Sequence, residues 1–268
     1  MLLVHRGTYL LAAGGFAVGT SAYVVSGVLS DVATSLGVSV AAAGQLSTAF
    51  ALSYALGAPL LAVLTGRWER RALLVVALLV AAAGNLAAAL APSYPLLIAA
   101  RILSALGAAV FSPGATVVAT QLNPPELRGR AVAAVYGGIT LSLVVGVPAG
   151  SLLGEPLGYR GVFALVGALC LAAALLVRVL LPAVAAPPVV GLRERLAVAA
   201  DARVVAVLAM TVVNLLAALS VYTYVAPLLE ATAGATGPTL SLLLLGYGAG
   251  ALVGNALGGR LADRFGST

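Results

Sequence analysis

Residues 72–91 read ALLVVALLVAAAGNLAAALA, a run of twenty residues without a charged side chain. A helix of about 20 apolar residues spans the roughly 30 Å hydrocarbon core of a lipid bilayer. Similar runs recur along the whole chain, in which 62% of the 268 residues are hydrophobic and only 8% are charged. A water-soluble domain cannot bury that much apolar surface. The sequence therefore predicts an all-α polytopic membrane protein, with the bilayer in place of a buried core.

Eight such runs are separated by short connections. Two of the connections, residues 91–95 and 123–126, contain prolines that cannot continue a helix. Short connections make consecutive helices antiparallel neighbours. The expected spans are Thr8–Leu29, Ala41–Leu64, Ala72–Ala91, Pro95–Thr120, Ala131–Gly154, Gly161–Leu181, Val204–Leu228 and Pro238–Leu261.

The longest connection lies between the sixth and seventh spans and predicts how the chain is organised. Residues 1–182 are expected to form an N-terminal six-helix half, and residues 183–203 a cytoplasmic linker. The linker contains the sequence GLRERL at residues 191–196, which favours a short interfacial helix. Residues 204–268 would then be the first two helices of an incomplete C-terminal half.

The arginines are distributed unevenly between the two sets of connections. The net charge is +6, but the basic residues are scattered singly and in pairs rather than gathered into a patch for nucleic acid. Cytoplasmic loops of membrane proteins are enriched in basic residues. One set of connections carries Arg6, Arg67, Arg70, Arg71, Arg128, Arg130, Arg178, Arg193, Arg195, Arg203, Arg260 and Arg264, and the other carries Asp31, Glu155, Arg160 and Glu230. This asymmetry predicts a multi-pass protein of the bacterial inner membrane with a cytoplasmic N-terminus, and no nucleic-acid partner.

The sequence offers little for catalysis or for binding a metal or cofactor. The only histidine, His5, precedes the first span, and the only cysteine, Cys170, lies within an apolar run. No two acidic residues share a span, so neither a zinc site nor a carboxylate pair is available inside the bilayer. We therefore expect no enzyme activity, no cofactor and no metal.

Arg101 is the one charge placed well within a predicted span. An arginine at that depth costs a few kcal/mol or more unless it faces the bundle interior or a wet cavity. Its distance from Pro95, at the start of the span, also allows the guanidinium to snorkel to the outer membrane face. We favour a functional position in the interior.

Two motifs resemble those of a known family. Residues 101–109, RILSALGAA, resemble the fourth-helix motif of major facilitator drug/proton antiporters, the chloramphenicol-resistance and arabinose-efflux-like bacterial exporters. Residues 138–150, GITLSLVVGVPAG, resemble the antiporter motif in the fifth helix of that family. The motif positions are Gly138, Gly146, Pro148 and Gly150. Its glycines would provide a smooth face for close helix packing, and its proline a local bend.

Loop signatures extend the resemblance. The sequence GRLADRFG at residues 259–266 resembles the loop between paired helices of a facilitator half, and residues 62–71 would be its counterpart in the first half. Gly66 replaces the usual acid of that counterpart, and Glu69 is the nearby acid that could substitute for it in a cytoplasmic gate. The gate residues implied by the resemblance are Gly66, Arg67, Arg70, Arg71, Arg128, Arg130, Gly259, Asp263, Arg264 and Gly266.

The resemblance implies an efflux transporter that exchanges a small-molecule cargo for protons by alternating access. Such proteins consist of two six-helix halves, of which this chain would contain the first and two helices of the second. Arg101 and Asp31 would form the intramembrane pair that couples export to protons, because Ala22 stands where similar exporters carry an acid. Possible contacts to a drug-like or amphipathic cargo are Tyr23, Asn214 and Tyr222.

Two other functions stay open at this point. A chain that stops after the eighth span would be a truncated, non-transporting membrane fragment or an assembly partner, because half of a second bundle cannot close a central pathway. A sugar exporter is the second alternative. The sparse and apolar set of candidate cavity residues favours an amphipathic cargo over a sugar.

The arginine asymmetry generates a topological prediction. The N-terminus and the loops around Arg70, Arg128 and Arg193 should be cytoplasmic. Single cysteines introduced there, after Cys170 has been replaced by serine, should not react with an impermeant maleimide added to intact cells. A cysteine beside Glu230 should react and serves as the control. Labelling of the Arg193 loop from outside would show that the predicted orientation is wrong.

Overall fold

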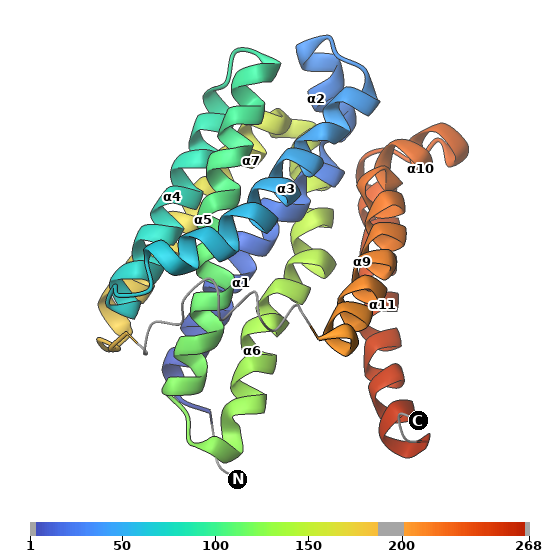
Figure 1. Ribbon diagram of the computed structural model, residues 1–268. Coiled ribbons are helices and arrows are strands. Elements are labelled where there is room, and N and C mark those ends of the chain that lie inside the picture. The colour runs from blue at the N-terminus through green and yellow to red at the C-terminus, as the bar shows by residue number, and fades with distance from the viewer. Residues whose placement is uncertain (1–3, 187–200, 266–268) are drawn as a thin grey trace.

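The computed structural model describes residues 4–186 and 201–265 (Figure 1). Within the last helix, side chains are described only as far as Gly250 and at Val253. The described residues are almost entirely helical and contain no strand. The predicted interfacial helix at residues 191–196 lies outside the described residues. The all-α fold class predicted from the sequence is confirmed.

The helices follow the predicted spans closely in number and order. The first six spans correspond to α1 (Arg6–Tyr23), α2 (Leu29–Leu36), α3 (Val40–Leu64), α4 (Arg70–Leu90), α5 (Tyr94–Gln121), α6 (Arg128–Leu141) and α7 (Val147–Leu180), together with short 3₁₀ segments at Val24–Gly27 (η1) and Pro125–Leu127 (η2) and a π-helical turn at Ser142–Gly146 (η3). The remaining chain forms α9 (Ala202–Thr223), α10 (Val225–Ala233) and α11 (Gly237–Phe265).

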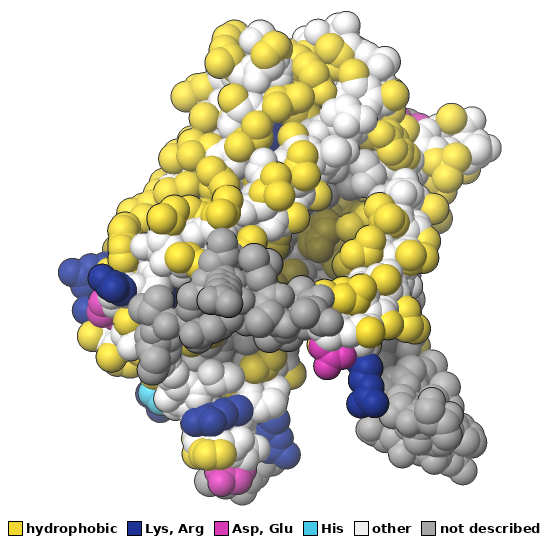
Figure 2. Space-filling view, viewed as in Figure 1, with side chains coloured by type: hydrophobic (Ala, Val, Ile, Leu, Met, Phe, Trp, Pro, Cys, Tyr) yellow, Lys and Arg dark blue, Asp and Glu magenta, His cyan; other side chains and the backbone are white. Residues whose placement is uncertain are grey.

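The surface of the molecule fits a bilayer. Six helical segments of the described chain are long and apolar enough to cross a membrane, and one of them, Pro125–Leu180, has 56 residues and covers the fifth and sixth predicted spans. Figure 2 shows hydrophobic side chains over the middle of the molecule and most of the visible arginines at its lower end. The protein is therefore a multi-pass membrane protein. We call the end that carries Arg67, Arg70, Arg71, Arg128 and Arg130 the Arg70 end, and the opposite one the Asp31 end.

The first span differs from the uniform helix expected over Thr8–Leu29. The α-helix stops at Tyr23, continues as the 3₁₀ turn η1, and starts again as α2, which runs to Leu36. Gly37 ends α2 with a positive φ of 63° that favours glycine. The membrane-crossing segment Arg6–Gly27 agrees with the predicted span to within two residues at each end, and Asp31 lies in the first turn of the separate short helix that follows it.

The fifth and sixth spans are joined through α7. The π-helical turn η3 comes directly before Pro148, which has no N–H to donate to the preceding turn. The motif implied a local bend at this proline, and the structure has a π-helical turn that ends two positions before it. Gly158, with φ 64° and ψ 171°, then breaks α7 at the Asp31 end, where the chain turns back into the bilayer.

Small residues bring the helices into close contact. α4 packs against α5 and α7, and α1 packs against α5, α6 and α7. A β-carbon on Gly107 of α5 would lie 2.5 Å from the Ala77 carbonyl oxygen of α4. Helices in lipid approach this closely because packing and hydrogen bonds, rather than the hydrophobic effect, hold them together. α9 to α11 lie beside this bundle and contact it mainly through α7, η3, η1 and α2 (Figure 1).

Candidate functional site

Arg101 is completely buried in the interior of the bundle. Its exposed fraction is 0%, so the guanidinium does not snorkel to the membrane surface. Nη1 donates a hydrogen bond of 2.8 Å to the Ser21 carbonyl oxygen, and Nη2 donates one of 3.4 Å to that of Ala22. The Cζ atom lies 4.5 Å from the ring centroid of Phe50 and 5.6 Å from that of Phe163. Two carbonyl groups and two aromatic faces therefore stabilise the charge.

The two carbonyl acceptors lie where α1 ends. Ser21 and Ala22 are in the last turn of α1, just before the chain tightens into η1. The last carbonyls of a helix have no partner within it, and in a bilayer an unpaired carbonyl costs several kcal/mol. Arg101 supplies donors at this position, so it stabilises the break in the first membrane helix.

The pairing of Arg101 with Asp31 predicted from the sequence is absent. Asp31 follows the break and lies on α2, nine positions beyond Ala22, which corresponds to a helical rise of roughly 13 Å. The hydrogen bonds of its carboxylate go to other groups, described below. The two groups do not meet because the guanidinium of Arg101 lies at the end of α1, whereas Asp31 lies beyond η1 on α2.

A buried amide extends the Arg101 site to α4. Asn85 Nδ2 donates to Ser21 Oγ at 2.8 Å and to the Ala81 carbonyl oxygen, and both Ser21 and Asn85 are fully buried. Ser21 therefore binds Asn85 through its hydroxyl and Arg101 through its carbonyl. The sequence analysis did not single out Asn85. Its signal was visible, because it is the lone polar side chain in the apolar run of residues 72–91.

The antiporter-like motif lies against α1 and η1, which run in the same direction as the fifth span. A β-carbon on Gly138 would overlap the Ala12 carbonyl oxygen. A β-carbon on Gly146 would lie 2.8 Å from Thr20 Oγ1, and one on Gly150 would lie 2.5 Å from Val24 Cγ2. The three glycines are eight and then four positions apart, and the residues that they face in the first span have the same spacing. The contact therefore continues for about three helical turns.

The first span contributes glycines to the same contact. A β-carbon on Gly15 would lie 2.9 Å from the Val135 carbonyl oxygen, and one on Gly27 would lie 2.9 Å from that of Val147. A β-carbon on Gly19 would overlap Ser142 Oγ. We call this two-sided contact the glycine seam; its members are Gly15, Gly19, Gly27, Gly138, Gly146 and Gly150.

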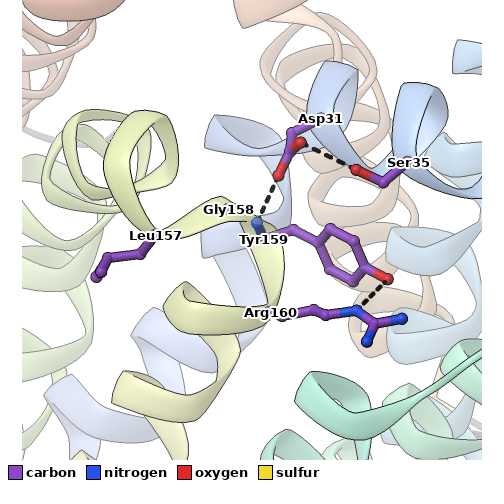
Figure 3. A pocket seen from close by; sticks show the side chains of 6 residues that line it. All are labelled: Asp31, Ser35, Leu157, Gly158, Tyr159 and Arg160. Carbon is purple, nitrogen blue, oxygen red and sulfur yellow. Dashed lines mark hydrogen bonds between the residues drawn. The ribbon is translucent and has the colours of Figure 1, made fainter.

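Asp31 lies in a small pocket at the Asp31 end of the bundle (Figure 3). The pocket has a volume of about 320 Å³. The Asp31 carboxylate accepts a hydrogen bond from the Tyr159 backbone N–H, directly after the break at Gly158, and another from Ser35 Oγ at 3.1 Å. Arg160, which also lines the pocket, donates instead to Tyr159 Oη and to the Ala91 carbonyl oxygen. Asp31 therefore connects α2 to the helix that begins at Tyr159.

The neighbouring residue on α2 connects the two parts of the molecule. Ser30 Oγ donates a 2.7 Å hydrogen bond to Glu230 Oε2 on α10. Among the described residues it is the one hydrogen bond between residues 4–186 and α9 to α11. Tyr224, the N-cap residue of α10, contacts α3, with its hydroxyl so close to Gly44 that a β-carbon there would overlap it. The described contacts between the two parts thus include a polar link at the Asp31 end.

Tyrosines line the interface between the two parts. The rings of Tyr23 and Tyr222 meet edge to face with centroids 6.3 Å apart, and Tyr222 contacts Tyr247 at 5.3 Å. Figure 2 shows the surface hollowed between α9 and the main bundle, with hydrophobic side chains on its visible walls. Asn214 is exposed on α9. Tyr23 and Tyr222 are two of the three predicted cargo contacts, whereas Tyr247 was not predicted.

The loop motifs lie at the Arg70 end. Arg67, Arg128 and Arg130 are exposed, whereas Gly66 is buried and its carbonyl accepts a 3.0 Å hydrogen bond from Arg70 Nη2. Arg71 Nη1 donates to the Leu181 carbonyl oxygen at 3.3 Å. In the second copy of the motif, Gly259 lies within α11, whereas the side chains of Asp263 and Arg264, and all of Gly266, lie outside the described residues.

Glu69 binds backbone groups at the start of α4 and after the end of α7. Its carboxylate accepts hydrogen bonds of 2.8 Å from the backbone N–H groups of Arg71, Ala72 and Val184. Partial burial raises the pKa of the Glu69 carboxyl, but these three N–H groups and the charge of Arg71 outweigh it and hold the pKa below its usual value. The idea that Glu69 replaces the missing gate acid is therefore not supported by its contacts.

The described residues contain no group of three or more His, Cys, Asp or Glu side chains that could hold a metal ion.

The fold and the site define a class: an α-helical membrane protein with a buried arginine at a broken first helix, a glycine-packed fifth span and an apolar recess between two bundles. The family profile described as Major Facilitator Superfamily matches residues 11–268. The chain belongs to this family, as the sequence motifs predicted.

Known proteins similar to this chain are transporters or resistance proteins. It is 39% identical over 258 residues to the uncharacterized MFS-type transporter YbcL of Bacillus subtilis, and 38% identical over 263 residues to a chloramphenicol resistance protein of Streptomyces lividans. Each alignment covers 96% of this chain and 66% of the relative, so the chain spans about two thirds of their length.

The fold is similar to that of solved transporters. A bacterial homologue of the human lysosomal transporter Spinster, in an inward-facing and unoccupied conformation, superposes with a TM-score of 0.77 at 23% identity. The match covers 97% of this chain and 62% of that one. Membership in a family of transporters agrees with the expectation that the chain is not an enzyme.

The glycine seam generates a stability prediction with a built-in control. Gly138→Ala should destabilise the bundle by about 1–3 kcal/mol, because the new methyl group overlaps a backbone carbonyl that cannot move alone. Gly137→Ala should leave stability unchanged or slightly raised, because nothing lies within 4 Å of a β-carbon there and alanine favours the helix. Thermal unfolding in detergent, followed by size-exclusion chromatography, measures both. Equal midpoints for the two variants would contradict the seam.

Proposed function

We propose that this chain is part of an efflux transporter that exports drug-like or amphipathic small molecules in exchange for protons by alternating access. The observation that carries the proposal is the glycine seam beside Arg101. A first helix that is broken at Tyr23, fastened by Arg101 and packed on a smooth face of the fifth span can move as one piece against its neighbours. Rocking of packed bundles around a central site is how such proteins alternate their access.

The proposed cargo is apolar or amphipathic. Tyr23 and Tyr222 offer aromatic faces and hydroxyl groups within an otherwise hydrophobic cluster at the interface between the two parts. Such a lining suits a planar or amphipathic molecule better than a sugar, which requires many hydrogen-bond partners. The resemblance to a protein named for chloramphenicol resistance supports the same choice. Asn214 is retained as a possible cargo contact on α9.

The proposed route for proton coupling runs through α2. Asp31 holds α2 to the start of the helix at Tyr159, and the adjacent Ser30 holds α2 to α10 through Glu230. Protonation of Asp31 would remove the negative charge that strengthens its bond to the Tyr159 N–H. The position of α2, and with it the contact between the two parts, would then depend on the proton. This route replaces the Arg101–Asp31 pair.

The remaining assignments belong to the same proposal. The chain is organised as a six-helix half at residues 1–182, a linker at 183–203 and two helices of a second half at 204–268. It lies in the bacterial inner membrane with a cytoplasmic N-terminus, and its gate loops include Asp263 and Arg264. Efflux by the product of the complete gene separates this proposal from its rival, a non-transporting fragment or assembly partner. The rival predicts no efflux with any cargo.

Arg101 provides the first functional test. Arg101→Ala in the product of the complete gene should reduce proton-driven efflux from inverted vesicles to background, because the carbonyls of Ser21 and Ala22 lose their donors. Arg101→Lys should retain partial activity, since it keeps the charge but not the planar fork. Immunoblots must show equal amounts of protein in the membrane. Normal efflux by Arg101→Ala would reduce Arg101 to a packing residue.

Asp31 provides the second functional test. Asp31→Asn should lower proton-driven efflux of a nitroaromatic antibiotic roughly ten- to hundredfold, the loss expected for removing a charged hydrogen-bond partner. Binding of the same compound in detergent should change little, because Asp31 lies in the outer pocket and not in the recess. Glu126→Gln, an exposed acid at the Arg70 end, is the matched control. Undiminished proton-driven efflux by Asp31→Asn would exclude the α2 route.

A further inference from the structure

Glu69 occupies an unusual place for a glutamate. It is the N-cap residue of α4, and its carboxylate accepts from the second and third N–H groups of that helix. Serine, threonine, aspartate and asparagine are the residues that normally fill this position, because their short side chains reach those N–H groups directly. The longer side chain is explained by a third bond, which reaches Val184 beyond the end of α7.

The chain after α7 lies along the start of α4. α7 ends at Leu180, and Pro182 prevents the helix from continuing. Val184 then forms a reciprocal pair of bonds: its N–H donates to Glu69 Oε1 at 2.8 Å, and its carbonyl oxygen accepts from the Arg70 N–H at 2.9 Å. The Arg70 N–H is the first of α4 and has no acceptor within the helix. The Val184 carbonyl therefore accepts a hydrogen bond from the Arg70 N–H, which the Glu69 carboxylate does not bind.

Apolar contacts strengthen this attachment. Leu181 is 1% exposed, and Val184 packs against the hydrophobic core of the bundle. Arg71 adds a bond to the Leu181 carbonyl oxygen. Leu181 and Val184, which lie on either side of Pro182, are thus both attached to the bundle.

We propose that residues 66–72 form a docking surface for the start of the segment that connects α7 to α9, and that Glu69 is the positioning residue that clasps it. One carboxylate then performs two tasks: it caps α4 and it holds Val184. The described start of the connecting segment, residues 181–186, is thereby attached to the N-terminus of α4. A displacement of α9 to α11 that pulls on the segment is therefore transmitted first to α4 and to the loop between α3 and α4.

Hydrogen exchange at four backbone amides can distinguish the capping of α4 from the docking of Val184. The Arg71 and Ala72 amides report capping, whereas the Arg70 and Val184 amides report docking. Hydrogen–deuterium exchange of the complete protein in lipid nanodiscs, resolved to single amides by fragmentation, measures all four. Glu69→Ala should accelerate exchange at all of them, roughly ten- to hundredfold at Val184, as expected for a lost bond to a charged acceptor.

Glu69→Asp is the decisive variant. Aspartate is a good N-cap residue but is one methylene shorter, so it should keep the Arg71 and Ala72 amides protected while the Arg70 and Val184 amides exchange faster. Glu126→Ala, in the exposed loop before α6, should change none of the four. The proposal is overturned if Glu69→Asp leaves Arg70 and Val184 as protected as in the unaltered protein, or if Glu69→Ala accelerates only Arg71 and Ala72.

Discussion

Inside a bilayer the polypeptide has to satisfy its own backbone polar groups, because no water is available to do so. This constraint makes the break in the first membrane helix the point on which the rest of the site depends. The chain leaves α-helical geometry at Tyr23, and the guanidinium of Arg101 binds the carbonyl groups of Ser21 and Ala22 there. The same residue, Ser21, also binds Asn85 on α4. Three membrane helices therefore meet at one polar contact in an otherwise apolar bundle.

The glycine seam is a second close contact of α1. α1 binds the arginine of α5 and the amide of α4, and it also packs on the fifth span, where side chains at the motif glycines would overlap it. Gly138 and Gly146 have no side chain that could overlap α1. The π-helical turn in the same contact precedes Pro148, which has no N–H to donate a helical hydrogen bond. Close packing, rather than burial from water, stabilises the pair.

The two ends of the bundle use polar groups differently. At the Asp31 end, neighbouring residues of α2 bind two different partners, Tyr159 and Glu230, so this short helix connects elements that are far apart in the sequence. At the Arg70 end, Glu69 and Arg71 bind the segment that follows α7. The apolar middle of the molecule, with its tyrosines between the two parts, thus lies between two polar layers.

The sequence by itself determined the membrane environment, the order of the spans, the family and the position of Arg101 and of the motif glycines within spans, because hydrophobic run length, charge depth and motif spacing are local properties. It could not reveal the partner of Arg101. A one-turn change of helix type at Tyr23 moves Asp31 to a separate helix, and no residue pattern in the apolar run indicated it. Tertiary structure alone decided that backbone carbonyls, rather than an acid, stabilise the buried charge, and that Glu69 binds Val184. Both contacts join residues far apart in the sequence, and their geometry depends on how the helices pack.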